Sequence, residues 1–379
     1  MEKRLIHLDF IRGFAAVVVM AGHLRVAWFV NYEQLPSHSW LDKAFYFVTG
    51  LGHQSVMIFF VLSGFFIAGS VSAAFDRDKW SWREYAINRL TRLWVVLLPA
   101  LMVTLIVDQI GIGLTHGAGY DGRYRELINS GPSPAIPANF SIATFVGNMA
   151  FLQTIVTPVF GSNGPLWSLA NEFWYYLLFP LLLQLFHPRS RLITRIIGGV
   201  LSSMMIVLLP KGLVLSGIVW LFGYGAYVIT STKSSFRICR TLPFFLVALV
   251  SLILFIGLAR SGKLPLGDYL VGVAFAGMIP FLTNLKSRFE LYEKSAIHLS
   301  NVSYTLYVFH FPFVAFLFYC FLPKERMLPT MAHYLGYAAC FLAVLGLSFP
   351  LWWLFESRTT EVKNVVRRIL KLPSSRPQP

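Results

Sequence analysis

The 379-residue sequence is 56% hydrophobic and 13% charged, and its mean hydropathy is +0.62. Soluble domains carry about a quarter of their residues as charged side chains, so this composition excludes a soluble protein and indicates a polytopic membrane protein. The formal net charge of +15 does not predict a nucleic-acid partner, because the lysines and arginines form short clusters between apolar segments. The three cysteines have neither metal-type nor paired spacing, so no metal site or disulfide framework is expected.

Ten segments are apolar and long enough to cross a hydrocarbon core of about 30 Å. They predict an all-α membrane bundle of about ten transmembrane helices, without a separate soluble domain or an internal repeat. The ten segments are 8–30, 53–74, 92–112, 165–187, 192–210, 212–231, 242–259, 266–285, 297–321 and 332–355.

The first apolar segment carries three ionisable side chains, Asp9, Arg12 and His23. On a helix they lie within about 60° of one another, so one face of this span is polar and the rest suits lipid. Ionisable groups at membrane depth usually mark a site or a pathway, and the alternative is an internal ion pair beside a hydrogen-bonded histidine. Because Asp9 and Arg12 interrupt the apolar run, we interpret it as a retained transmembrane helix and not as a cleaved signal peptide.

The distribution of lysine and arginine predicts that both termini are cytoplasmic, as the positive-inside rule requires. The stretch 142–160 is apolar but interrupted by polar residues, and counting it as a span would invert every later loop. We therefore expect a re-entrant or outer-surface segment that is shielded from lipid. The loop before it, 113–141, is rich in Gly, Pro and Ser and is either a lid over a site or a plain connector.

Two arginines, Arg89 and Arg92, lie three residues apart at the cytoplasmic start of the third span. Two guanidinium groups on one helix face suit phosphate groups, although anchoring to lipid headgroups fits the same spacing.

The fourth span carries Glu172 among aromatic residues that include Trp167. A carboxylate there is either a proton-handling group or the partner of a cation from the first span.

Two further motifs lie in the second and ninth spans. The run FFVLSGFFIAG places Ser63 and Gly64 where they allow close helix approach. The run SYTLYVFHFP places His310 in the ninth span, with Tyr307 one turn before it. Such a histidine belongs either to a site or to a hydrogen bond between helices.

Taken in chain order, from the first span to the ninth, these motifs resemble those of the acyltransferase 3 family of integral membrane O-acyltransferases. The resemblance rests on LDFIRG with the Arg-x10-His spacing from Arg12 to His23, on FFVLSGF, on the Arg89 and Arg92 pair, on WSLANEFWYY and on SYTLYVFH. It covers most of the chain and implies a ten-span core. Some relatives carry an added extracytoplasmic domain, whose contribution is expected to be absent here or supplied by another protein.

The resemblance implies transfer of an acyl group, usually acetyl, from acetyl-CoA in the cytoplasm to a hydroxyl of a cell-surface or lipid-linked glycan, in the bacterial inner membrane. Direct transfer and a transient acyl-enzyme both stay open, because no serine or cysteine stands out as a nucleophile. The expected organisation is a transmembrane acyltransferase domain, 1–357, and a basic cytoplasmic tail, 358–379. The expected roles are donor binding by Arg12, Arg89 and Arg92, general-base catalysis by His23, orientation of its imidazole by Glu172 or Asp9, and substrate binding by His310, Trp167 and Tyr307.

Other functions fit parts of the same sequence. Charged side chains on several spans suit a proton-coupled transporter, although no inverted repeat accompanies them. Within the enzyme class, a small hydroxylated metabolite such as a macrolide is the alternative acceptor. A non-catalytic scaffold for glycan assembly would not need His23. The sequence does not distinguish the acceptors or give the oligomeric state.

Overall fold

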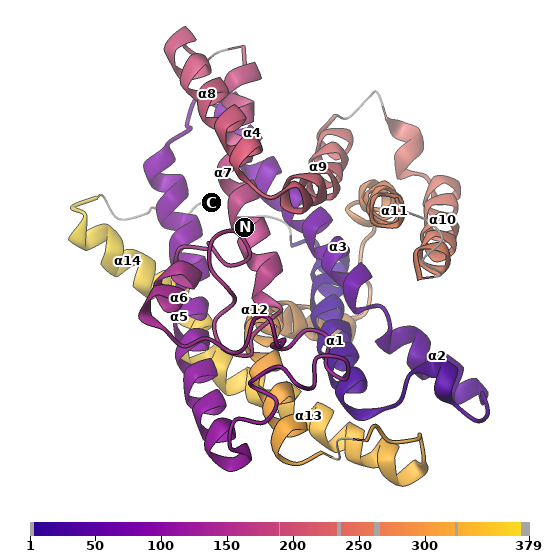
Figure 1. Ribbon diagram of the computed structural model, residues 1–379. Coiled ribbons are helices and arrows are strands. Elements are labelled where there is room, and N and C mark those ends of the chain that lie inside the picture. The colour runs from indigo at the N-terminus through magenta and orange to yellow at the C-terminus, as the bar shows by residue number, and fades with distance from the viewer. Residues whose placement is uncertain (1–3, 189, 233–235, 261–265, 323–324, 373–379) are drawn as a thin grey trace.

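The computed structural model describes residues 4–188, 190–232, 236–260, 266–322 and 325–372. Within these ranges the chain is a bundle of α-helices, and its only β-structure consists of isolated bridges (Figure 1). The predicted all-α membrane bundle is therefore confirmed.

Every predicted span coincides with helical structure. The first three spans correspond to α1 (Ile6–Trp28), to the series α3 (Gly52–Ser63), η2 (Gly64–Ala68) and α4 (Gly69–Asp76), and to α5 (Trp82–Thr115). The other seven correspond to α7 (Leu166–Phe186), α8 (Leu192–Leu208), α9 (Lys211–Ser231), α10 (Leu242–Arg260), α11 (Gly267–Leu282), α12 (Glu290–Cys320) and α13 (Met331–Leu354).

Seven helical segments in the described ranges are long and apolar enough to cross a membrane. They are α1, α3 to α4, α5, α9, α10, α12, and the segment Met331–Ile369. Two predicted spans, α8 and α11, are apolar but only 17 and 16 residues long. The 21-residue α7 contains Asn171 and Glu172, which lower its mean hydropathy. The number of crossings therefore stays a prediction.

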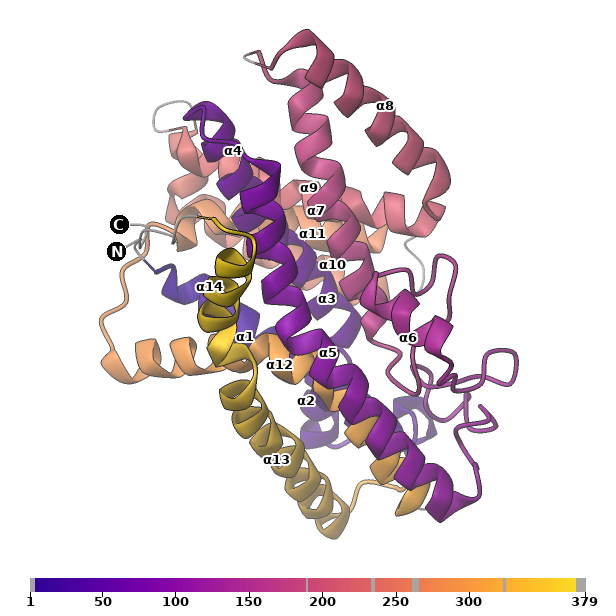
Figure 2. The same cartoon turned by 90° about the vertical axis from the view of Figure 1, so that its left-hand side faces the viewer.

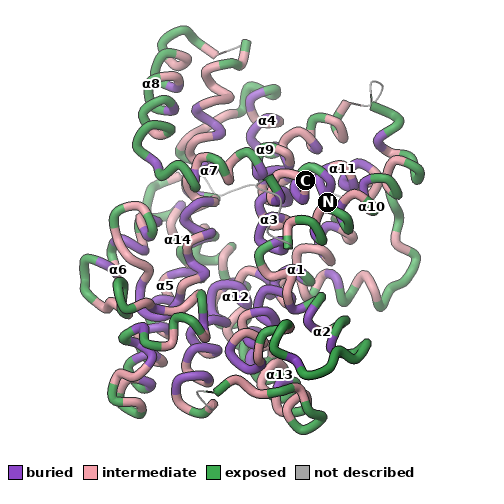
Figure 3. Tube along the Cα trace, turned by 45° about the vertical axis from the view of Figure 1, so that its right-hand side comes forward, coloured by how far each residue is buried: buried purple, intermediate pink, exposed green. Residues whose placement is uncertain are grey.

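The centre of the bundle is formed by α1 and α12, which pack along each other. Ala16 and Met20 of α1 are fully buried against Leu306 of α12. Figure 3 shows buried residues concentrated in the central helices, whereas α8 and α10 are mostly exposed or intermediate. Small residues on α1 allow this close contact, which brings the polar face of the first span against the ninth.

The second span contains a π-helical turn, η2, at the predicted Ser63 and Gly64 motif. A Cβ atom at Gly64 would collide with the backbone carbonyl of Trp220 on α9, and one at Gly223 would collide with that of Val61. The two helices therefore approach each other at backbone distance, as the small residues predict. Turns of this kind are frequent near functional sites.

Helix α5 is 34 residues long and crosses the whole bundle, with Pro99 in its interior (Figure 2). The tail helix α14 (Thr359–Ile369), which follows η4 (Glu356–Arg358), packs beside its first part, where Arg367 donates to both oxygens of Glu84 at 2.6 and 3.0 Å. The predicted tail 358–379 thus includes a packed helix, and residues 373–379 lie outside the described ranges. The division at residue 357 stays a prediction.

The connection from α5 to α7 contains one short helix, α6 (Ile142–Met149). Its eight residues are about 12 Å long, whereas a span needs about 20 residues. The stretch 142–160 therefore does not cross the membrane as a helix, in agreement with the predicted re-entrant or surface segment.

Two short helices lie between the first two spans: η1 (Tyr32–Gln34) and α2 (Trp40–Thr49). They were not predicted from the sequence, although Ser39 and Asp42 form a capping box at the start of α2. The remaining short helix is η3 (Arg237–Arg240).

Candidate functional site

A hydrogen-bonded histidine pair joins α1 to α12. The Nδ1 atom of His310 lies 2.8 Å from the carbonyl oxygen of Tyr307 and 3.1 Å from that of Leu306. Carbonyl oxygens only accept hydrogen bonds, so this Nδ1 carries a proton and Nε2 of the neutral ring is an acceptor. That Nε2 lies 2.8 Å from Nδ1 of His23, which is therefore the donor. As a result, the Nε2 atom of His23 has no proton and is available as an acceptor.

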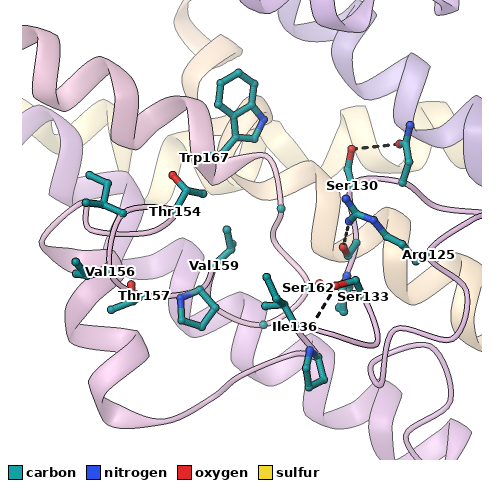
Figure 4. Close-up of a pocket in the computed structure, with 18 residues that line it drawn as sticks. Arg125, Ser130, Ser133, Ile136, Thr154, Val156, Thr157, Val159, Ser162 and Trp167 are labelled. Atoms are coloured by element: carbon teal, nitrogen blue, oxygen red, sulfur yellow. Dashed lines mark hydrogen bonds between the residues drawn. The ribbon is translucent and has the colours of Figure 1, made fainter. Parts of the chain in front are cut away.

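The loop from α5 to α6 supplies a hydroxyl group to this acceptor. The Oγ atom of Ser130 lies 3.2 Å from Nε2 of His23 and 3.4 Å from the side-chain oxygen of Asn129. Ser130 also lines a cavity of about 860 Å³. Figure 4 shows this cavity between the loops 125–137 and 154–164, with Trp167 at the start of α7. The cavity lining combines serine and threonine hydroxyl groups with proline and aliphatic side chains, and it has one amide, that of Asn129, and one charged side chain, that of Arg125.

The other two polar residues of the first span, Asp9 and Arg12, form an ion pair of 2.9 Å. Both contact Ser300 of α12, whose hydroxyl donates to Asp9 at 2.8 Å and accepts from Arg12. This cluster is 11 residues from His23 along α1, which is about 16 Å on a helix. The polar face predicted from the sequence is thus real, but it consists of two separate clusters.

The arginines of α5 face the same end of the bundle as Arg12. Arg92 lies 3.8 Å from Glu356, and Arg89 donates to Ser70 at 3.3 Å. Glu356 also interacts electrostatically with Arg12. The structure therefore brings the three predicted donor-binding arginines to one region. About half of the Arg92 side chain is exposed, at 49%, so the rest of the protein does not enclose it.

The predicted orienting carboxylates lie away from the histidine pair. Glu172 accepts a hydrogen bond of 2.7 Å from Tyr176, whose hydroxyl in turn accepts one from Ser63 at 3.3 Å. Asp9 is bonded to Arg12, as described above. The group that contacts Nδ1 of His23 is His310, which is 1% exposed.

Tyr307 of α12 contacts the start of α7, where Trp167 also lies. The hydroxyl of Tyr307 is 2.6 Å from that of Ser168 and donates to the carbonyl of Pro165 at 3.2 Å. Its ring centroid is 6.0 Å from that of His310. Trp167 lines the cavity directly, whereas Tyr307 contacts Ser168 and Pro165 and is not one of the lining residues.

Three polar side chains of this region were not predicted from the sequence as site residues. Asp108 is fully buried within the third span and accepts hydrogen bonds from the backbone and hydroxyl of Ser162 at 2.7 and 2.8 Å. An acidic residue inside an apolar span was the signal for it. Glu356, at the end of the last span, accepts from Thr305 at 2.6 Å and had the same signal. Ser130 had no local signal, because its partner is distant in sequence. Among the described residues no group of three His, Cys, Asp or Glu side chains is placed to hold a metal ion.

Comparisons with known proteins agree with this architecture. A family model described as an acyltransferase domain matches residues 5–356. The acyltransferase MdmB of Streptomyces mycarofaciens is 29% identical over 181 residues, which are 47% of this chain and 39% of that protein. The peptidoglycan O-acetyltransferase OatA of Listeria monocytogenes is 27% identical over 220 residues, which are 55% of this chain and 29% of that protein. The matches therefore cover well under half of these relatives.

No solved structure matches the chain significantly. The family match nevertheless extends from the start of α1 to just past the end of α13, and it includes both histidines, the three arginines and the loop that carries Ser130. On this evidence the chain belongs to the acyltransferase family.

Proposed function

We propose that this protein is a membrane O-acyltransferase that moves an acetyl group from acetyl-CoA to a hydroxyl of a cell-surface or lipid-linked glycan, in the bacterial inner membrane. The family match supports the acyl transfer, and the name of one relative, a peptidoglycan O-acetyltransferase, suggests the class of acceptor. A proton-coupled transporter has no comparable support.

The observation that carries the proposal is the histidine pair beside the cavity. With its Nδ1 proton donated to His310, His23 has an unprotonated Nε2 atom directed at a hydroxyl group. A neutral imidazole in this tautomer is a general base for a hydroxyl nucleophile. In this proposal His310 is a positioning residue and not a substrate contact, because its ring nitrogens are bonded to His23 and to backbone carbonyls.

The donor enters at the other end of α1 in this proposal. Arg89 and Arg92 bind the phosphates of CoA, since paired guanidinium groups suit phosphate oxygens. Arg12, held by Asp9, is on the same helix as His23, and the extended pantetheine arm of CoA bridges the distance of about 16 Å from Arg12 to His23 along α1. Glu172 interacts electrostatically with Arg92 and Arg89.

The acceptor occupies the 860 Å³ cavity in this proposal. A lining of hydroxyl, aliphatic and proline side chains with one charge suits an acceptor that has both polar and apolar faces, such as a sugar, and Trp167 is the aromatic side chain available for stacking. Trp167 contacts the acceptor directly, and Tyr307 acts through Ser168 and the backbone of Pro165.

The test is acetyl transfer by purified full-length protein in liposomes, with soluble peptidoglycan fragments or a hydroxylated macrolide as acceptor. We expect His23→Ala to lose about 100-fold or more of the rate, the usual contribution of a general base. The matched control is His298→Ala, because His298 lies on α12 but is exposed. Full activity in His23→Ala, or no acetyl-CoA turnover by the wild type with either acceptor, would contradict the proposal.

The donor part of the proposal is tested by acetyl-CoA binding to the same preparation. Arg89→Ala with Arg92→Ala should weaken binding by about tenfold or more, since a charged hydrogen bond contributes about 1.5 to 3 kcal/mol. Binding should also lose salt dependence. Arg77→Ala, an exposed arginine of the neighbouring loop, is the control. Unchanged affinity in the double variant would assign the pair to lipid anchoring instead.

A further inference from the structure

Ser130, His23 and His310 form a continuous hydrogen-bonded series. Because Nε2 of His23 has no proton, the Ser130 hydroxyl is the donor of their 3.2 Å contact, and Oδ1 of Asn129, at 3.4 Å, is a second acceptor for the same proton. Nδ1 of His23 donates to Nε2 of His310 at 2.8 Å. A nucleophile within hydrogen-bond reach of a base, with the base oriented by a third group, is the signature of covalent catalysis. The imidazole of His310 occupies the place that a carboxylate has in the usual triad.

The segment that carries Ser130 is firmly held. Ile128 is 1% exposed, and Arg326 donates to the carbonyl groups of Glu126 and Leu127. A Cβ atom at Gly164 would collide with the carbonyl oxygen of Ser130, so the two loops pack at backbone distance. A catalytic side chain needs this kind of support, because its atoms must stay close to the reacting geometry.

The loop of Gly164 is in turn fixed to the membrane helices. The side chain of Asn163 donates to the carbonyl of Val308 on α12 at 2.9 Å, and Ser162 is bonded to the buried Asp108 on α5. Asp121 lies earlier in the same connection as Ser130 and outside the spans. It accepts hydrogen bonds from the side chain of Arg123 and from backbone groups, and these bonds hold the pKa of its carboxyl below the usual value. Ser130 is therefore part of the scaffold and not of a free connector.

Ser130 is also positioned between the base and the acceptor cavity. It is half-buried, it lines the 860 Å³ cavity, and its hydroxyl already uses the acceptor atom of His23. A hydroxyl that enters from the cavity meets Ser130 before it reaches Nε2 of His23. Direct transfer would require this hydrogen bond to be displaced, whereas transfer through Ser130 uses it.

We propose that Ser130 is the nucleophile of a two-step transfer and carries the acetyl group as an ester. This inference rests on the proposed function. In the first step the Ser130 oxygen attacks the thioester carbon while His23 takes the hydroxyl proton; the C–S bond breaks, and the proton passes to the CoA thiolate. In the second step the acceptor oxygen attacks the ester carbon and gives its proton to His23. The bond from that carbon to Ser130 breaks, and the Ser130 oxygen recovers the proton.

The experiment is to incubate the full-length protein in liposomes with isotopically labelled acetyl-CoA and no acceptor, and to locate the label by peptide mass spectrometry. We expect a burst of free CoA, with acetyl on the peptide that contains Ser130, and loss of this label when soluble peptidoglycan fragments are added. Ser130→Ala should not be labelled and should transfer more than about 100-fold more slowly. Ser130→Cys should carry the acetyl group as a thioester that neutral hydroxylamine releases.

The matched control is Ser37→Ala, since Ser37 is an exposed serine between η1 and α2 and does not line the cavity. Thermal melting confirms that each variant is folded. Transfer by Ser130→Ala at the wild-type rate, or a label on another residue, would overturn the inference and leave Ser130 as an occupant of the acceptor position. Absence of transfer by the wild type would instead contradict the proposed function, so the two failures are distinguishable.

Discussion

At the scale of single residues, the state of His23 is set by atoms outside its own helix. Two backbone carbonyls fix the proton of His310, and His310 then fixes the proton of His23. The ring of Phe311 packs edge-on against His23, with centroids 5.1 Å apart, and limits its rotation. Neutral groups therefore set the tautomer of His23, which avoids the cost of placing a carboxylate beside it at membrane depth.

This arrangement predicts different effects for two substitutions of His310. His310→Ala leaves the Nδ1 proton of His23 without an acceptor, and we expect kcat to fall by about tenfold to 100-fold, with the KM for acetyl-CoA unchanged. His310→Gln offers a side-chain oxygen to the same proton and should recover most of the rate. The measurement is kcat across a range of pH in liposomes, where the alanine variant should have an altered pH profile. A glutamine variant as slow as the alanine variant would indicate a packing role.

At the scale of elements, the site depends on how closely neighbouring helices approach. The contact of α3 and η2 with α9 is made at Gly64 and Gly223, where backbone meets backbone. Ser63, in the same turn, accepts a hydrogen bond of 3.1 Å from Trp220 and donates to Tyr176, the partner of Glu172. The small residues of the second span thus position the polar groups around Glu172.

Two glycines on α9 allow this packing to be tested. A methyl group at Gly223 would collide with the carbonyl of Val61, so Gly223→Ala should destabilise the protein by about 1 to 3 kcal/mol, the cost of overpacking. Gly225 has open space at the same position, and Gly225→Ala should be neutral or slightly stabilising. Thermal melting in detergent compares the two. Equal melting temperatures would show that the helices can separate at little cost.

At the scale of the whole molecule, the two halves of the site lie at opposite ends of long helices. Helix α5 has 34 residues and is about 51 Å long, which exceeds the hydrocarbon core of about 30 Å. Arg89 and Arg92 lie near its start, and the loop with Ser130 follows its end. In the proposed orientation the arginines face the cytoplasm, so the acetyl group crosses the membrane within the protein.

This orientation predicts which positions a membrane-impermeant thiol reagent reaches in intact cells. In a variant whose three native cysteines are replaced by serine, Ser133→Cys should be labelled from outside the cytoplasmic membrane. Lys79→Cys, in the loop before α5, should react only after the membrane is opened. Labelling of position 79 alone in intact cells would reverse the proposed topology.

The sequence by itself determined the membrane class, the helical positions and the polar face of the first span. These features depend on local properties: the length of an apolar run, and the spacing of Asp9, Arg12 and His23 on one helix. The same local patterns predicted Arg89, Arg92 and Glu172 as ionisable groups at or near membrane depth. The helix bounds were less well predicted, since α5 and α12 continue beyond their apolar segments.

Only the tertiary structure decided which of these groups meet. His23 contacts His310, 287 residues away, and Ser130, 107 residues away, instead of Asp9 or Glu172. A periodic pattern specifies which face of a helix is polar, but not which other helix covers that face or which loop folds over its end. Those contacts depend on the packing of distant segments such as the Asp108 and Ser162 connection. For this reason the sequence identified His23 and His310 as candidate site residues, but not their contact with each other or with Ser130.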